Sequence, residues 1–259
     1  MRPGGAALYA AVAAHRLGLS AGILTSHGGD FPLDALPPQI EVVTVDAPAT
    51  TALEYGRARD AGRQRLGSIA RPLATADVPD DWREAPLVLL APVIDEVDAH
   101  LVTAFPDATF GAAAQGWLRS LTPEGEVVGR EWTPPAFLLG RLQTLVVSAG
   151  DVRGQEAAAI EWAQRVPVMA ITACRAGALL YVNGDRFEVR PHRARQVDAT
   201  GAGDVFAAAL LIAYDRSGDA WQAAEAAACA AALSIEAEGH AAVPDVAALE
   251  AALADYRTH

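Results

Sequence analysis

The chain has 259 residues, of which 52% are hydrophobic, and its formal net charge is -12. This length and composition suit one domain with a large core, so we expect residues 1–259 to fold as a single unit. The excess of acidic residues argues against a nucleic acid or an anionic membrane as a partner, since both would repel the protein.

Membrane and redox signals are weak. No run reaches the roughly 18 consecutive apolar residues that a membrane span needs. The Ala-rich stretch near the N-terminus runs straight into His15-Arg16, which favours a buried helix over a signal peptide. Cys174 and Cys229 lie far apart without metal-type spacing, so we expect free thiols in a cytoplasmic protein.

The first 70 residues predict a helix, two strands and a hairpin. We expect the helix over residues 4–17 and buried strands at 21–25 and 40–45. Within residues 46–70, alternation around a Gly-containing turn predicts an antiparallel hairpin. This segment is also the most basic part of the chain, with Arg57, Arg59, Arg63 and Arg65. It is either a solvated hairpin or a lid over an anionic ligand.

From residue 85 onward, buried strands alternate with helices. We expect strands at 87–91, 108–114, 145–148 and 168–172, helices at 93–104, 135–141, 154–165, 201–215, 219–238 and 245–256, and a hairpin over 178–189. This alternation predicts an α/β fold, a mostly parallel sheet with helices on both faces. Ligands bind beyond the carboxyl ends of such strands, where Gln115, Ser148 and Thr172 fall.

One stretch carries a chemical signal, and it runs from Val197 to Phe206. The small residues Gly201, Ala202 and Gly203 leave backbone N–H groups uncovered at the start of an apolar helix, where an anion is favoured. Asp204 follows in the first turn. A carboxylate beside an anion hole would repel the anion, so its presence indicates a base that takes a proton from a nucleophile attacking that anion.

This stretch resembles the C-terminal signature of the ribokinase/PfkB carbohydrate kinase family, on Asp198-Ala199-Thr200-Gly201-Ala202-Gly203-Asp204-Val205-Phe206. Pro3-Gly4-Gly5-Ala6, followed by a helix that ends at Leu17-Gly18, is similar to the family's N-terminal glycine region. The resemblance covers nearly the whole chain and implies a three-layer ribokinase-like fold with a small β lid over residues 46–70. A Gly-x-x-x-x-Gly-Lys-[Ser/Thr] phosphate loop is absent from the sequence.

The resemblance implies a kinase that phosphorylates a hydroxyl of a sugar, polyol or nucleoside from ATP with Mg²⁺. Asp204 would then be the base, and Gly201, Ala202 and Gly203 would bind the transferring phosphoryl group. The implied nucleotide contacts are Thr172, Gly177 and Thr200, and the implied substrate contacts are Gly4, Gly5, Arg63, Gln115 and Arg119. The implied metal ligands are Asp151 and Asp198. Asp198 and Thr200 could instead cap the helix or shape its loop.

The chain also departs from the family pattern. The given sequence starts after the point where the family has its first strand and a substrate-binding acid, so we expect either that the gene start lies upstream or that the protein lacks part of the pocket and a central strand. Tyr9 stands where the family often has an Asn, Ser148-Ala149-Gly150-Asp151 replaces the Asn-x-x-Glu stretch, and Cys174 replaces a glycine of the nucleotide loop. A second function therefore stays open, a non-catalytic pseudo-kinase that binds ligand or nucleotide.

Further features are similar to a branch of the family that includes inositol kinases, namely Thr50-Thr51, Gly62-Arg63-Gln64, Asp77-Val78-Pro79 and Gln115-Gly116-Trp117-Leu118-Arg119. This similarity implies a cyclic polyol as the acceptor. The family resemblance and the hairpin together also lead us to expect a homodimer formed through the lid.

Overall fold

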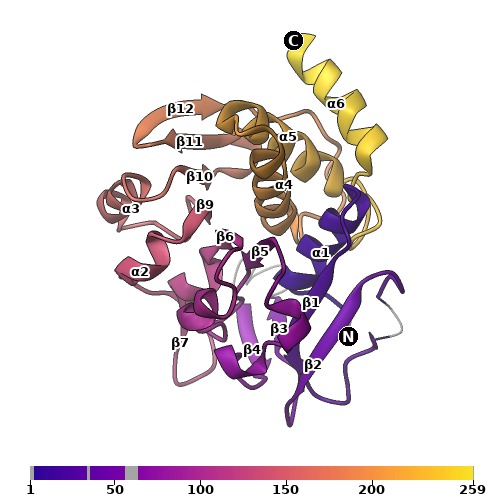
Figure 1. The fold of residues 1–259 in the computed structure, drawn as a ribbon, viewed down its shortest axis with the longest axis vertical. Coiled ribbons are helices and arrows are strands. Elements are labelled where there is room, and N and C mark those ends of the chain that lie inside the picture. The colour runs from indigo at the N-terminus through magenta and orange to yellow at the C-terminus, as the bar shows by residue number, and fades with distance from the viewer. Residues whose placement is uncertain (1–2, 34–35, 56–63, 259) are drawn as a thin grey trace.

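The computed structural model describes residues 3–33, 36–55 and 64–258 (Figure 1). Its largest sheet has the strand order β12-β11-β10-β9-β6-β5. The bounds of these strands are β5 Leu87–Leu90, β6 Thr109–Ala113, β9 Leu142–Ser148, β10 Val168–Thr172, β11 Ala178–Val182 and β12 Asp185–Val189. Strands β5, β6, β9 and β10 are parallel to one another, while β11 and β12 are antiparallel to their neighbours.

The burial of the strands explains this arrangement. The parallel strands are apolar runs without alternation, as expected for strands covered on both faces, and β9 and β10 are mostly buried. β11 and β12 are joined by Asn183-Gly184, where both residues have positive φ. Such a pair fits a two-residue hairpin turn, so the predicted hairpin over 178–189 is confirmed.

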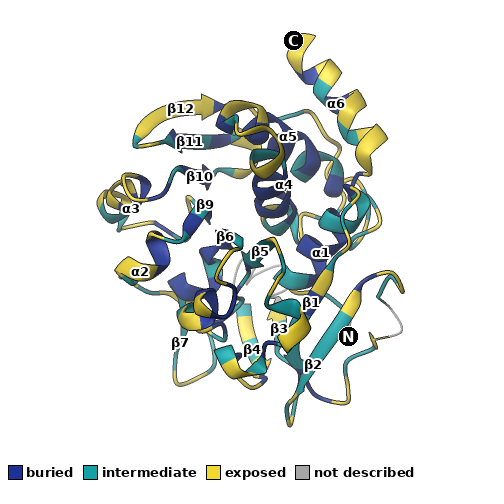
Figure 2. Ribbon diagram, viewed as in Figure 1, coloured by how far each residue is buried: buried dark blue, intermediate teal, exposed yellow. Residues whose placement is uncertain are grey.

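Helices cover both faces of the sheet (Figure 1). One apolar core lies under α1, α4 and α5, and the other lies under α2, α3 and the 3₁₀ helix η5. The bounds are α1 Ala6–Arg16, α2 Ala136–Leu139, α3 Glu156–Ala163, α4 Ala202–Ser217, α5 Ala220–Ser234, α6 Val246–Thr258 and η5 Ala99–Ala104. Figure 2 shows α4 as mainly buried, which agrees with its run of buried residues from Val205 to Ile212. The predicted α/β architecture with helices on both faces is confirmed.

A second parallel pair, β1 (Gly22–His27) and β2 (Glu41–Asp46), forms its own two-stranded sheet. Ile23 packs into the core under α1 and α4, and Leu24 packs against the other core. In β5, Leu89 packs against the core under α1 and α4, and Val88 packs against the other core. The two sheets thus share both layers, although no described strand is hydrogen-bonded between β1 and β5.

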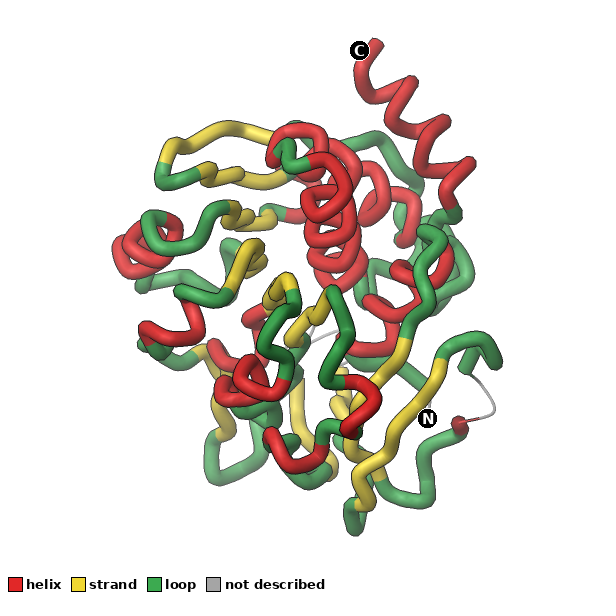
Figure 3. The backbone as a smooth tube through the Cα atoms, viewed as in Figure 1, coloured by secondary structure: helices red, strands yellow, loops and turns green. Residues whose placement is uncertain are grey.

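The basic segment contains the expected antiparallel strands, β3 (Ala52–Tyr55) and β4 (Gln64–Ser68). A second ribbon, β7 (Arg119–Leu121) and β8 (Val127–Gly129), lies beside them (Figure 3). The Leu66 N–H donates to Gly125 O at 2.8 Å, and Arg65 Nη2 donates to Glu124 O at 2.7 Å. These bonds join the two ribbons into one layer. Whether this layer acts as a lid stays a prediction.

The helix predicted over 93–104 is wrong for its first half. Glu96 accepts the N–H groups of Val93 and Ile94 at 2.7 and 2.6 Å, so its carboxylate holds a tight turn. Asp95 has φ 63 and pairs with Arg130 through both carboxylate oxygens. These local bonds replace helical ones, and only the short 3₁₀ helix η5 follows.

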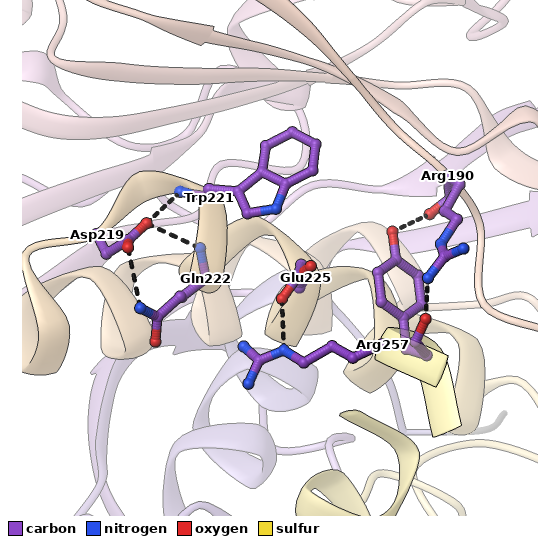
Figure 4. A network of polar contacts seen from close by, with 7 residues as sticks. Arg190, Asp219, Trp221, Gln222, Glu225 and Arg257 are labelled. Atoms are coloured by element: carbon purple, nitrogen blue, oxygen red, sulfur yellow. Dashed lines mark hydrogen bonds and ion pairs between the residues drawn. The ribbon is translucent and has the colours of Figure 1, made fainter. Parts of the chain in front are cut away.

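Polar contacts fix the C-terminal helices (Figure 4). Asp219 caps α5 by accepting the N–H groups of Trp221 and Gln222 at 2.9 and 3.0 Å. Glu225 of α5 pairs with Arg257 of α6 at 2.8 Å. In addition, the guanidinium of Arg190 donates to Tyr256 O, and the Tyr256 hydroxyl donates to Arg190 O at 2.9 Å.

Among the described residues, no helix combines the length and the apolar character needed to cross a bilayer. Both cysteines are free, with Cys174 exposed and Cys229 buried, as expected from their spacing.

Candidate active site

The predicted anion hole lies at the start of α4. Gly201 is the N-cap of this helix and has a left-handed backbone, with φ 79 and ψ -3. Within the described chain, no hydrogen-bond acceptor binds the N–H groups of Gly201 or Gly203, whereas Ala202 makes a long 3.3 Å bond to Ala199 O. A Cβ atom at residue 203 would meet no atom within 4 Å. The first turn of α4 therefore has backbone N–H groups without a described acceptor, and the space on the Cβ side of Gly203 is open.

Asp204 stands in this first turn. Burial raises the pKa of its carboxyl group to about 7, and the nearby guanidinium of Arg119 opposes that rise. A general base is most effective when its pKa lies near the working pH, because it is then both deprotonated and basic. The geometry thus gives Asp204 the properties of a base beside an anion-binding helix terminus.

Arg119 connects Asp204 to a cavity of about 200 Å³ under the two ribbons. Arg119 is the first residue of β7 and directly follows the 3₁₀ helix η6 (Ala114–Leu118). The residues that line this cavity are Gln64, Leu118, Arg119, Val127, Val128, Gly129, Gly150 and Asp151. An arginine and a carboxylate on the wall of one cavity suit a site for phosphate oxygens and a divalent cation.

The carboxylate of Asp151 belongs to a tight turn after β9. Its Oδ2 accepts from Ser148 Oγ at 2.6 Å and from the Ser148 N–H at 3.2 Å. No described residue donates to its Oδ1. One oxygen is therefore fixed and the other faces no described donor, an arrangement that fits a ligand of Mg²⁺.

The structure describes no group of three or more His, Cys, Asp or Glu side chains that could hold a metal on their own. Magnesium sites that also use substrate phosphates need only one or two protein carboxylates, so this finding fits the expected Asp151 ligand.

Asp198 shapes the loop before the anion hole. Its Oδ1 accepts the Thr200 N–H at 3.0 Å, and its Oδ2 accepts the Gly239 N–H at 3.1 Å. The Ile235 carbonyl also accepts the N–H groups of Val197 and Asp198. These bonds tie the loop to the end of α5, which supports the loop-shaping alternative for Asp198 and Thr200.

The expected nucleotide loop follows β10. Thr172 is the last residue of that strand, and its hydroxyl donates to Val147 O at 3.3 Å. Gly177 has φ 85, and a Cβ atom there would lie 2.1 Å from Val189 O. Only glycine fits this position, so Gly177 has a structural role in addition to any contact with a ligand.

The expected substrate contacts are spread over several elements. Gly4 and Gly5 precede α1, and Cβ atoms at either position would meet nothing within 4 Å. Gln115 lies in η6 and is half-buried, but it does not line the cavity that contains Arg119. Arg63 lies outside the described residues.

Two features of the site escaped the sequence. Gln64 and the strand β8 line the cavity, and Tyr9 of α1 packs against Gly201. The register of Tyr9 with the family's Asn was visible in the sequence, but its contact with Gly201 depends on how α1 packs on α4.

Residues 141–246, from β9 to the start of α6, match the sequence profile of the pfkB family carbohydrate kinases. Over these residues the chain is similar to the pfkB carbohydrate kinases, which are phosphotransferases with an alcohol group as acceptor. The matched residues include Gly201, Ala202, Gly203 and Asp204.

Solved structures resemble this chain over nearly its whole length. A pyrophosphate-dependent myo-inositol-1 kinase, studied for its conversion to a 3-kinase, shares 21% identity over 98% of this chain and 91% of its own, with a TM-score of 0.79. A pyrophosphate-dependent ribokinase-family kinase, solved as a sulfate complex, shares 20% identity over 92% and 89%, with a TM-score of 0.77.

Ribokinase from Arabidopsis thaliana, complexed with ribose and ATP, shares 19% identity over 96% of this chain and 87% of its own, with a TM-score of 0.71. At these identities the likeness establishes the ribokinase-like fold alone. No curated protein matches the sequence.

Proposed function

We propose that this protein transfers the terminal phosphoryl group of ATP to a hydroxyl of a sugar, polyol or nucleoside. The observation that carries this proposal is the position of Asp204. It lies in the first turn of α4, next to the open amide groups of Gly201 and Gly203 and near the guanidinium of Arg119.

In the proposed reaction, the carboxylate of Asp204 accepts the proton of the acceptor hydroxyl. The acceptor oxygen forms a bond to the terminal phosphorus, and the bond from that phosphorus to the bridging oxygen of the donor breaks. The amides of Gly201–Gly203 and the guanidinium of Arg119 stabilise charge on the transferring group. Phosphoryl transfer requires mainly such alignment and charge neutralisation from the protein.

Mg²⁺ would neutralise charge on the donor phosphates, and Asp151 is the described carboxylate best placed to bind it. The Ser148 hydroxyl orients that carboxylate within its turn.

The acceptor class follows from the family, whose members act on carbohydrates and related alcohols. The similar structures extend this class from ribose to myo-inositol. Within it, we propose a cyclic polyol, because the Gln115–Arg119 segment resembles that of inositol kinases and because Arg119 lies beside Asp204.

Pyrophosphate is a second candidate donor. Two similar structures come from pyrophosphate-dependent kinases, and the loop that leads into the anion hole is unusually basic for an acidic protein. Arg175 donates to Gln196 at 3.2 Å, which ties the turn after β10 to this loop. Arg193 and Arg195 are exposed, and among the described salt bridges none involves the guanidinium of either, although the Arg195 N–H donates to Glu236 Oε1 at 2.9 Å. Such arginines suit a compact polyanion.

The test is turnover of a panel of sugars, inositols and nucleosides with Mg²⁺ and either ATP or pyrophosphate. The Asp204→Asn variant serves as the control. We expect one donor to support turnover that this variant lacks. Equal activity of the variant would reject the catalytic assignment. Tight donor binding without transfer in the wild type would favour the pseudo-kinase alternative.

We further propose that two copies associate through the layer formed by the ribbons. Ile69, Leu121 and Val128 are large apolar residues of this layer, and each is between 38% and 49% exposed. Sedimentation at micromolar concentration should show a dimer that an Ile69→Lys/Val128→Lys variant weakens. A wild-type monomer would contradict the proposal.

A further inference from the structure

The ring of Tyr9 lies directly against Gly201. Tyr9 belongs to the first part of α1 and is only 2% exposed. A Cβ atom at residue 201 would lie 2.2 Å from Cγ and Cδ1 of this ring and 2.5 Å from Cδ2. Such distances are far below van der Waals contact, so the ring occupies the space on one side of the Gly201 backbone.

The contact restricts the backbone of the anion hole. Gly201 has φ 79, and this left-handed conformation turns its peptide groups at the start of α4. The ring of Tyr9 therefore fills the space on the Cβ side of Gly201, whereas the Cβ side of Gly203 is unoccupied.

Tyr9 also lies between the N-terminal glycines and the start of α4. Its N–H donates to Gly5 O at 3.3 Å, so the ring lies one helical turn from the glycines expected to contact the acceptor. α1 packs on α4 within one apolar core that contains Tyr9, Val205 and Phe206. A single buried side chain thus connects the acceptor end of α1 with the phosphoryl end of α4.

We propose that Tyr9 is a positioning residue that acts through Gly201. Its ring holds the left-handed peptide and aims the amides of the anion hole at the phosphoryl group. This inference rests on the proposed phosphoryl transfer. It adds a residue whose ring would align the Gly201 peptide with the transferring phosphoryl group. Misplacement by about 1 Å can cost roughly 100-fold in rate, so we expect the ring to affect kcat more than substrate affinity.

The experiment compares Tyr9→Phe, Tyr9→Leu and Val12→Ala. Val12 is 1% exposed in the same helix, so its truncation disturbs the core without removing the ring beside Gly201. We expect Tyr9→Leu to lower kcat by about 10- to 100-fold with the KM for the acceptor within about threefold. Tyr9→Phe keeps the ring and should keep kcat within about threefold, and Val12→Ala should do the same.

Binding of pyrophosphate, measured by calorimetry, is a second readout that does not depend on turnover. Tyr9→Leu should weaken it by about tenfold, as expected for misdirected donors, and Val12→Ala should not. An unchanged kcat and an unchanged pyrophosphate affinity in Tyr9→Leu would overturn the proposal. Equal loss in Tyr9→Phe or Val12→Ala would overturn it too, because the effect would then come from the hydroxyl or from general loosening of α1. If the wild type shows no turnover, the proposed function fails, while the binding result still decides the role of Tyr9.

Discussion

The guanidinium of Arg119 lies close enough to Asp204 to lower the pKa of its carboxyl group, while burial raises it by more, to about 7. Arg119 comes from the start of β7 and Asp204 from the first turn of α4, so the pair links the ribbon layer to the anion hole. The same arginine lines the cavity with Asp151. The proposed base Asp204, the cavity-lining Arg119 and the proposed metal ligand Asp151 therefore belong to one connected region.

The pKa of Asp204 predicts the pH dependence of activity. A base must be deprotonated to accept a proton, so kcat/KM should fall as the pH drops below about 7 and should level off above it. The measurement is kcat/KM for the best acceptor between pH 5 and pH 9. An acid limb near the usual range of aspartate, around pH 4, would show that Asp204 is not the titrating base.

Loss of Arg119 should move the acid limb of the pH–activity profile to higher pH. Arg119→Gln removes the cation that lowers the pKa of Asp204, so the acid limb should shift to higher pH. The maximal rate should also fall, since the transferring phosphoryl group loses a charged partner. Arg186→Gln is the control, because Arg186 is exposed on β12 and pairs with Glu188. An unchanged limb in Arg119→Gln would contradict the coupling.

Replacement of the base should remove activity and leave the fold intact. Asp204→Asn should lower kcat by about 100- to 10,000-fold, the usual contribution of a general base. Its midpoint of thermal unfolding should not fall, because a neutral amide is easier to bury than a carboxylate. Asp215→Asn, at an exposed position of the same helix, is the matched control. Near-normal turnover of Asp204→Asn would exclude the assigned role.

Asp151 should determine the magnesium requirement. Asp151→Ala removes the proposed ligand, so half-maximal activity should need about tenfold more Mg²⁺, with a smaller effect on the KM for the acceptor. Ser148→Ala removes only the hydroxyl that orients the carboxylate and should give an intermediate shift. Titration of Mg²⁺ after treatment with a chelator measures both. An unchanged requirement in Asp151→Ala would place the metal elsewhere.

The C-terminal helix should stabilise the domain through one ion pair. Arg257→Ala leaves Glu225, which is 9% exposed, without its partner at 2.8 Å. We expect the free energy of unfolding to fall by about 1–3 kcal/mol, the cost of an unsatisfied, largely buried polar group. Glu225→Gln/Arg257→Ala should recover part of this loss, since the buried charge is gone. Urea unfolding gives both values, and equal losses in the two variants would contradict this explanation.

Much of the fold could be predicted because its signals are local. The apolar runs of β5, β6, β9 and β10 were visible without any contact map, and Asn183-Gly184 marked its hairpin. The helix predicted over 93–104 was wrong in its first half, because Glu96 accepts a backbone N–H group of a turn and Asp95 pairs with Arg130. The periodicity of apolar residues does not reveal such hydrogen bonds. Propensity gave way there to specific hydrogen bonds.

The site was predictable in part for the same reason. Gly201–Asp204 are contiguous, so the chemistry of a small-residue loop, a helix N-terminus and an acid can be inferred from their order. The assembly of Arg119, Asp151 and Gln64 around one cavity involves three distant segments and required the packing of the ribbons on β9.

By itself, the sequence predicted the fold class of this protein and proposed the chemistry of its central loop, because the spacing of small residues and one acid at a helix start is encoded locally. Only the tertiary structure decided what surrounds that loop. It placed Arg119 beside Asp204 and the ring of Tyr9 against Gly201. Burial and side-chain contact depend on distant segments meeting in space, and these two properties set the pKa of Asp204 and the space around Gly201.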